Sequence, residues 1–284
     1  MRLNIDHRTG FRYTKPVKSS YNEARMTPAA TDHQTVWSAR VSVEPSAWSF
    51  TYVDYWGTTV TTFELHEKHE RLTVQAQAVV DTKGDDLPWD TERRVATNDL
   101  GWAALRDRGV IDTMTEYLSV DGRTECPDEL RELISDAAGQ PPRLAGLDVC
   151  GIVHDRLTYE RGSTAVTSTA AEVWELGRGV CQDFSHVALS ALRSIGLPAR
   201  YVSGYLHPGG VPANTRVPGE SHSWVEWWCG SWVSYDPTQH QRLTDRYVRV
   251  GHGRDYGDVA PLRGTYSGGG SSDMFVTVEL TELG

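Results

Sequence analysis

One stretch in the middle of the chain, residues 177–195, constrains the fold more than any other. From residue 184 onward, its apolar side chains recur with the period of a helix, which predicts one continuous buried face. The residues of that face are Phe184, Val187, Ala188, Ala191, Leu192 and Ile195. Gly196 and Pro198 then follow, in the order in which these residue types end helices. We therefore expect a buried helix that ends near residue 195.

A glycine-flanked loop brings Cys181 to the first turn of this helix. Unpaired backbone N–H groups and the helix dipole favour negative charge at that position. Because the thiolate is the nucleophilic form of cysteine, Cys181 is a candidate nucleophile. A buried structural cysteine is the alternative, although such a residue would more naturally lie within the apolar face.

Residues 1–80 have the pattern of a β-rich, sandwich-like domain. Short runs such as 35–43 and 71–76 alternate apolar and polar residues and are rich in Thr, Val and Trp. Residues 81–91 are polar and contain Gly84 and Pro88, which predicts a linker. We assign residues 92–284 to a second domain, with a helical first part that extends to about residue 158. Helices are expected at about 127–138 and 147–157.

His222 and Asp236 are the candidate partners of Cys181. Imidazole accepts and returns a proton near neutral pH, and a carboxylate can fix its tautomer. The two residues lie on the arms of a predicted hairpin. A three-residue loop over 228–230, with its glycine in the left-handed conformation, would place His222 directly opposite Asp236. A two-residue turn would instead put the two side chains on opposite faces.

Composition excludes several classes of function. The net charge of −10 argues against a nucleic-acid binder and against binding to an anionic membrane surface, because both need basic patches. The first ten residues lack an apolar signal segment, and no apolar run is long enough for a membrane span. The four cysteines are far apart, without metal-binding spacing. We expect free thiols, a cytoplasmic location, and neither a metal nor another cofactor.

Beyond these residue patterns, several motifs resemble the core of the transglutaminase-like superfamily. They are Gly179–Phe184 (GVCQDF), Leu197–Tyr205 (LPARYVSGY), His222–Glu226 (HSWVE) and Tyr235–Thr238 (YDPT). Together with Gly253–Pro261 (GRDYGDVAP), they are similar to the bacterial branch with a separate β-rich N-terminal domain. The resemblance is specific over about 150–262 and weaker elsewhere. Gln239 and His240 stand where the family often has Asn-Gly, and the chain has no calcium-loop pattern.

The resemblance implies an α+β fold with a papain-like core, in which the helix that carries Cys181 packs on an antiparallel sheet. It places the core motifs over 159–262 and implies Cys181 as nucleophile, His222 as base and Asp236 as the orienting residue. Such an enzyme transfers an acyl group from an amide through a thioester. The backbone N–H of Cys181 is one expected oxyanion donor. Tyr159 and Trp174 are candidates for the second, and Tyr159 is preferred.

Three functions remain open at this stage. Hydrolysis of a peptide or other amide substrate is preferred, because no sequence feature indicates a second, amine-binding site. A transglutaminase or ligase-like enzyme is the first alternative, and a non-catalytic binding protein on the same fold is the second. Neither the substrate nor the oligomeric state follows from the sequence.

Overall fold

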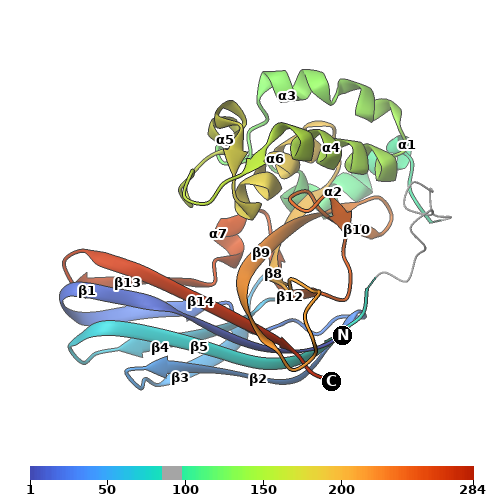
Figure 1. Cartoon of the computed structure of the whole chain (residues 1–284). Helices are drawn as coiled ribbons and strands as arrows, with labels where there is room; N and C mark the ends of the chain where they lie inside the picture. The colour runs from blue at the N-terminus through green and yellow to red at the C-terminus, as the bar shows by residue number, and fades with distance from the viewer. Residues whose placement is uncertain (85–97) are drawn as a thin grey trace.

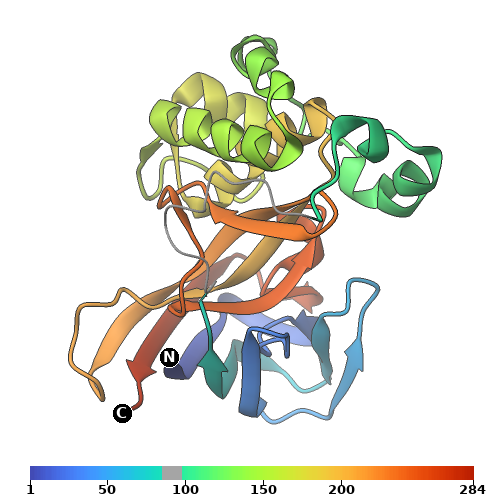
Figure 2. The same cartoon turned by 90° about the vertical axis from the view of Figure 1, so that its right-hand side faces the viewer.

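The structure is a computed structural model that describes residues 1–84 and 98–284, so part of the predicted linker lies outside the described residues. Helices lie on one side of a curved sheet, and an arm of long strands projects on the other (Figures 1 and 2). The helices are α1 (Trp102–Leu105), α2 (Arg108–Leu118), α3 (Asp128–Leu133), the 3₁₀ helix η2 (Ser135–Gly139), α4 (Pro142–Arg156), α5 (Ala170–Leu176), α6 (Cys181–Ser194) and α7 (Tyr256–Val259). The strands are β1 (Arg2–Ala24), β2 (Gln34–Glu44), β3 (Ser49–Val53), β4 (Thr59–Leu65), β5 (His69–Thr82), β6 (Thr158–Tyr159), β7 (Arg178–Gly179), β8 (Ala199–Leu206), β9 (Arg216–Trp228), β10 (Trp232–Asp236), β11 (Gln241–Arg242), β12 (Tyr247–Gly253), β13 (Leu262–Gly268) and β14 (Ser272–Glu282).

The projecting arm is organised around β1, a strand of 23 residues. Its first half pairs with β5 on one side and β14 on the other, and its second half pairs with β4 and β13. Three consecutive glycines with positive φ, residues 268–270, join β13 to β14. The two strands thus pair along β1 in turn, β13 along its second half and β14 along its first. The β-rich character predicted for residues 1–80 is confirmed.

The two C-terminal strands belong to this N-terminal sheet. Leu3 pairs with Glu282 in β14, and Ala24 pairs with Leu262 in β13. The prediction had placed residues 262–282 in the catalytic domain, whereas by strand pairing they extend the N-terminal sheet. The first and last residues of the chain consequently lie side by side in both views (Figures 1 and 2). The division at residues 80 and 92 itself stays a prediction.

Strand β9 joins the arm to the rest of the molecule. Its residues 216–219 pair with β14, residues 220–227 pair with β8, and residues 225–228 pair with β10. A hydrophobic cluster fills the junction and draws on both parts of the chain. Its most buried members include Leu3, Ile5, Val80, Val248 and Leu280. The two parts therefore share a core, and the sheet of β8, β9, β10, β11 and β12 is continuous with the N-terminal one.

The predicted central helix is confirmed as α6, which begins three residues earlier than its apolar face. Phe184, Val187 and Leu192 are almost completely buried, and they pack in one cluster with Val225 and Trp227 of β9. The helix predicted near 127–138 is split into α3 and η2, and the helix predicted over 147–157 starts earlier, at Pro142. Proline suits the first helical turn, where its missing N–H has no helical partner.

The register of the β9–β10 hairpin differs from the prediction. The loop comprises residues 229–231, and Trp228 pairs with Trp232. Continuing this register puts Asp236 opposite Trp224, so His222 lies diagonal to Asp236 rather than directly opposite. The loop lies one residue later in the chain than predicted, so the residue opposite Asp236 changes by two positions. A change of two positions keeps the two side chains on one face of the hairpin. The shift arises because Gly230 (φ 100°) occupies the middle of the loop, against the backbone of Asn98.

Candidate active site

Cys181 is the first residue of α6, and its neighbours hold the preceding loop in place. The Asp183 carboxylate accepts hydrogen bonds from the Val180 backbone N–H (2.7 Å) and the Thr164 hydroxyl (2.6 Å). Gly179 fits closely over this carboxylate, because a Cβ at position 179 would lie 2.6 Å from the Asp183 Cβ. Cys181 is also half-buried, whereas the three other cysteines, all free thiols, are buried. The loop therefore presents one accessible thiol at a helix N-terminus.

Asp236 is completely buried, and its carboxylate accepts four hydrogen bonds. Oδ1 accepts the backbone N–H groups of Thr238 (2.8 Å) and Gln239 (3.1 Å). Oδ2 bonds to His222 Nε2 (2.6 Å) and accepts the Tyr247 hydroxyl (2.7 Å). Backbone and side-chain donors together fix the orientation of the carboxylate, and the carboxylate in turn fixes that of the imidazole.

His222 links Asp236 to Cys181. Burial by itself lowers the pKa of His222, but hydrogen bonds with Asp236 and with Cys181 outweigh it and raise this pKa to about 10. Since Nε2 is engaged by Asp236, Nδ1 is the nitrogen available to the thiol. The structure thus brings Cys181, His222 and Asp236 together: His222 bonds to Asp236 and lies close enough to Cys181 for their side chains to interact.

The three remaining thiols are chemically different from Cys181. Burial raises the pKa of Cys229 to about 12, and it also raises the pKa values of Cys126 and Cys150. Since the thiolate is the reactive form, these cysteines are poor nucleophiles. Cys150 has an exposed fraction of 0% and is part of the main core cluster.

Of the two oxyanion candidates, only Tyr159 lies near Cys181. Its half-exposed ring lines the same cavity as Cys181, and its hydroxyl lies 3.4 Å from Glu220 Oε2. Trp174 is buried in the main core cluster, where its indole N–H donates to Glu129 (2.9 Å). The catalytic role of Tyr159 stays a prediction.

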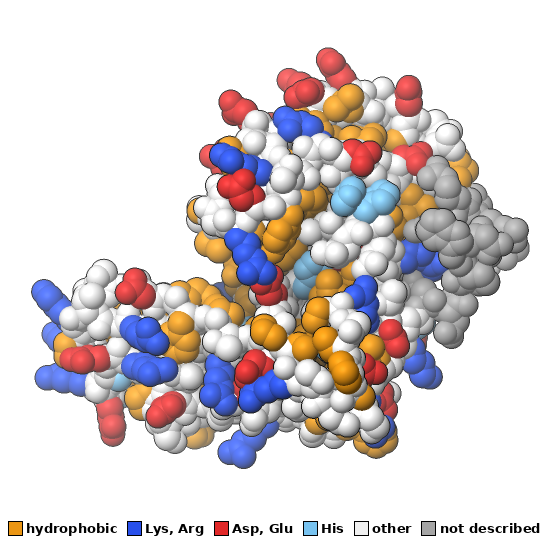
Figure 3. Space-filling view, viewed as in Figure 1, with side chains coloured by type: hydrophobic (Ala, Val, Ile, Leu, Met, Phe, Trp, Pro, Cys, Tyr) orange, Lys and Arg blue, Asp and Glu red, His pale blue; other side chains and the backbone are white. Residues whose placement is uncertain are grey.

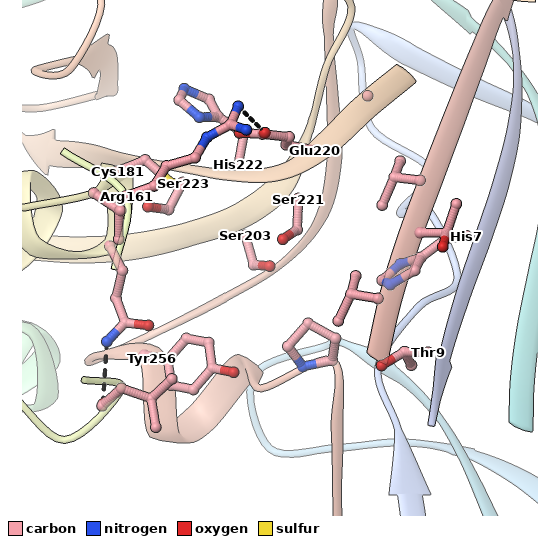
Figure 4. Close-up of a pocket in the computed structure, with 18 of the residues that line it drawn as sticks. His7, Thr9, Arg161, Cys181, Ser203, Glu220, Ser221, His222, Ser223 and Tyr256 are labelled. Carbon is pink, nitrogen blue, oxygen red and sulfur yellow. Dashed lines mark hydrogen bonds and ion pairs between the residues drawn. The ribbon is translucent and has the colours of Figure 1, made fainter. Parts of the chain in front are cut away.

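A cavity of about 540 Å³ opens beside Cys181 and His222. The molecule is hollowed between the helical part and the arm, with hydrophobic side chains on both sides of the hollow (Figure 3). In Figure 4, Cys181, Ser203 and His222 lie on one side of the cavity, and His7 and Thr9 lie on the other. Strands β8 and β9 and the N-terminal sheet therefore form opposite walls of a single cavity.

A second cavity, of about 450 Å³, adjoins His222 and is lined by Gln239 and Arg246 among others. Tyr159, Arg161 and Glu220 line both cavities, and Arg161 and Glu220 form an ion pair between them. Both side chains of this pair are largely exposed, so it contributes little to stability and can open at small cost.

The sequence reasoning missed two kinds of site residue. Tyr247 follows Asp236 by 11 residues, and no motif marked it as a partner of Asp236. His7, Thr9, Met274 and Val276 lie near the two ends of the chain, and only the pairing of β1 with β14 brings them together. No local pattern indicates such contacts.

The described residues also bear on metal binding and on membrane spanning. Residues 1–84 and 98–284 contain no group of three His, Cys, Asp or Glu side chains arranged to hold a metal ion. Within the same residues, no helix has both the length and the apolar character needed to cross a membrane.

The fold and the cysteine at the start of α6 define a class of α+β proteins with a papain-like core. Comparison with known proteins agrees. Residues 135–237 match the transglutaminase-like superfamily, and residues 3–81 match the bacterial transglutaminase-like N-terminal region. The chain belongs to the transglutaminase-like superfamily, in the form that carries this N-terminal region.

Similar proteins extend over the whole chain. An uncharacterized protein of Mycobacterium leprae is 41% identical over 99% of both chains, and one of Mycobacterium tuberculosis is 32% identical over 98% of this chain and 92% of its own. The structure of a candidate cysteine protease from Cytophaga hutchinsonii superposes with a TM-score of 0.74 at 20% identity. It covers 100% of this chain and 91% of that one. At this identity, the likeness concerns the fold.

Proposed function

We propose that this protein is a cysteine-dependent enzyme that transfers an acyl group from an amide bond through a thioester. Cys181 is the nucleophile, His222 the general base and acid, and Asp236 the residue that orients His222. The observation that carries the proposal is the bond of 2.6 Å between His222 Nε2 and a fully buried Asp236, which leaves Nδ1 for the thiol.

Before the substrate binds, the thiol proton has moved to His222 Nδ1, which leaves Cys181 as a thiolate beside the imidazolium. The Cys181 thiolate attacks the carbonyl carbon, and the carbonyl π electrons move to oxygen to give a tetrahedral oxyanion. The backbone N–H of Cys181, which has no acceptor within the helix, is one donor to this oxygen, and Tyr159 is the proposed second. As the C–N bond breaks, its electron pair leaves with nitrogen, which takes the proton from His222.

The thioester is then resolved by a second nucleophile. In hydrolysis, which we prefer, water gives a proton to His222 and attacks the thioester carbonyl, and the thiolate leaves. The substrate is a peptide or another amide. Neither a cofactor nor a nucleic acid or membrane partner enters this scheme, and we retain the cytoplasm as the proposed location.

The test measures alkylation of each thiol by iodoacetamide as a function of pH, in the wild type and in His222→Ala and Asp236→Ala. The pKa of His222 is raised to about 10, so the imidazole stays protonated beside the sulfur at neutral pH. We expect rapid alkylation of Cys181 alone below pH 8, at least about tenfold slower alkylation in His222→Ala, and a smaller loss in Asp236→Ala.

Mass spectrometry of peptides identifies the alkylated cysteine. A His66→Ala variant serves as the control, because His66 is exposed, pairs with Glu64 and lines neither cavity beside His222. Sluggish alkylation of Cys181 up to pH 9, or equal rates in all variants, would contradict the enzymatic role. A non-catalytic binding protein would then be the better description.

Transfer to an amine is the second candidate, and the cavity of about 450 Å³ that adjoins His222 favours it. An amine in that cavity could reach the thioester while the acyl group occupies the larger cavity. Once a substrate is found, partitioning of the acyl-enzyme between water and added hydroxylamine separates the two. Hydrolysis that persists in excess hydroxylamine supports the peptidase or amidase, and formation of the hydroxamate supports the transferase.

A further inference from the structure

The cavity wall opposite Cys181 belongs to the N-terminal sheet. His7 and Thr9 of β1 pair with Val278 and Val276 of β14, and all four line the cavity together with Met274. Nearer the chain ends, the same two strands pack against β12 of the catalytic part through Ile5 and Leu280, in the shared core. Because that core holds it firmly, this wall is a fixed part of the site.

The wall is apolar, although it lies partly open to solvent. Met274 and Val276 are 53% and 47% exposed, and Val166, on the side of Cys181, is 58% exposed. Apolar side chains left uncovered on both sides of a cleft are typical of a surface that a ligand covers.

Charge is scarce around this cavity. Apart from Cys181 and His222, the described lining residues include only Arg161 and Glu220 as charged groups, and these two bond to each other. An ionised group that enters such a cavity loses its hydration without gaining a counter-ion. The lining therefore favours an uncharged ligand.

His7 is a polar member of this wall, as is Thr9, whose hydroxyl donates to the Phe275 carbonyl. Its side chain is 1% exposed, and its ring projects from the sheet toward the cavity (Figure 4). Nδ1 lies 2.9 Å from the Tyr205 hydroxyl, and Nε2 is buried without a partner. Burial lowers the pKa of His7 to about 4, so the ring is neutral at pH 7.

The hydrogen bond with Tyr205 is consistent with either ring tautomer of His7, and we take the one in which Nδ1 accepts. Burial raises the pKa of Tyr205, so its hydroxyl keeps a proton that it can donate to Nδ1. A neutral imidazole that accepts at Nδ1 carries its own proton on Nε2. His7 therefore offers one unused N–H donor at the apolar wall, and an unpaired buried donor is costly unless a ligand supplies an acceptor.

We propose that the N-terminal sheet selects the acyl group of the substrate: an uncharged, apolar acyl chain of peptide type, with a carbonyl oxygen that accepts the His7 Nε2–H bond. The apolar side chain lies against Val276 and Met274, and the scissile carbonyl lies at Cys181. His7 is thus a specificity residue. This inference rests on the proposed acyl transfer, because it assumes that the acyl group occupies the larger cavity.

The test uses chloromethyl ketones of two N-acetyl dipeptides, dileucine and diaspartate. Iodoacetamide is the control reagent, because it is too small to contact the wall while it reacts with Cys181. Each dipeptide reagent alkylates Cys181 with loss of chloride and carries amide carbonyls as acceptors. We expect the dileucine reagent to react at least about tenfold faster than the diaspartate reagent. His7→Leu should slow the dileucine reagent by about three- to tenfold, and His7→Gln, which keeps an N–H donor, should restore most of that rate.

Matched variants separate this effect from general damage. His69 is also buried in the N-terminal sheet with Nε2 unpartnered but does not line the cavity, so His69→Leu should leave every rate unchanged. Val276→Lys, at a half-exposed position, should shift the preference toward the diaspartate reagent. Val53→Lys, on the exposed strand β3, should not.

Each outcome has a defined meaning. The inference is overturned if iodoacetamide labels Cys181 normally but the two dipeptide reagents react at equal rates. It is also overturned if His7→Leu and Val276→Lys have no effect. In both cases the proposed function stays intact. Failure of Cys181 to react with any reagent overturns the proposed function, and the inference with it.

Discussion

At the scale of the residue, Asp236 shows how a buried charge is kept in place. Four donors converge on its two oxygens, and two of them are backbone N–H groups of the turn that follows it. A buried carboxylate without such donors would be strongly destabilising. The Asp-Pro-Thr turn therefore orients the carboxylate in addition to ending the strand.

Tyr247→Phe removes one of the four donors and leaves the ring in place. We expect the free energy of unfolding to fall by about 1.5–3 kcal/mol, because hydrogen bonds to a charged group contribute that much. Urea unfolding measures the loss. Tyr52→Phe removes a hydroxyl bond to the partly exposed Glu23 and should cost less. Equal losses in the two variants would show that burial of the acceptor does not matter here.

At the scale of the element, the loop before α6 determines where the thiol lies. Gly177 adopts a positive φ of 70° and ends α5, and Gly179 then passes against Asp183. A left-handed residue and a close backbone approach follow each other within three positions, which explains the glycine-rich sequence before Cys181. The same glycines were the signal that identified the stretch in the sequence.

Gly179→Ala tests this element. The added Cβ would lie 2.6 Å from the Asp183 Cβ, so the loop or the helix start must move. We expect a stability loss of about 1–3 kcal/mol and slower alkylation of Cys181 by iodoacetamide, because overpacking displaces backbone. Gly139→Ala is the control, since a Cβ there meets nothing within 4 Å. Unchanged alkylation in Gly179→Ala would show that the loop adapts without moving the thiol.

At the scale of the whole molecule, strands from the two ends of the chain pair in the N-terminal sheet. They also form the junction between that sheet and the rest of the molecule. β1 is the first strand and β14 the last, and both contribute to the cluster that packs on β8, β9 and β12. Because this cluster belongs to both parts, we expect them to unfold together rather than as separate domains.

Leu280→Ala tests the junction. Leu280 is 0% exposed, so its truncation should cost about 2–5 kcal/mol and lower the midpoint of a single unfolding transition. Tryptophan fluorescence and far-ultraviolet circular dichroism, followed in the same urea titration, should give coincident curves. Leu133→Ala, at a 53% exposed position of α3, should change stability little. Two separated transitions in the wild type would contradict a shared core.

Local patterns predicted a large share of the fold and of the site. The 3.6-residue period identified α6, and alternation identified the β-rich N-terminal region. Residue type together with position at element ends singled out Cys181, His222 and Asp236. The hairpin register was wrong by one residue on each strand, because the position of a glycine within a loop depends on what the loop packs against.

The sequence by itself determined the central helix, the glycine loop that presents Cys181, and the chemical types of the three candidate site residues. Each of these rests on interactions within a few positions along the chain. Only the tertiary structure decided that β13 and β14 pair with β1, that Tyr247 donates to Asp236, and that His7 faces the cavity of Cys181. The physical reason is that strand pairing and cavity walls join residues far apart in sequence, and no local periodicity encodes such partners.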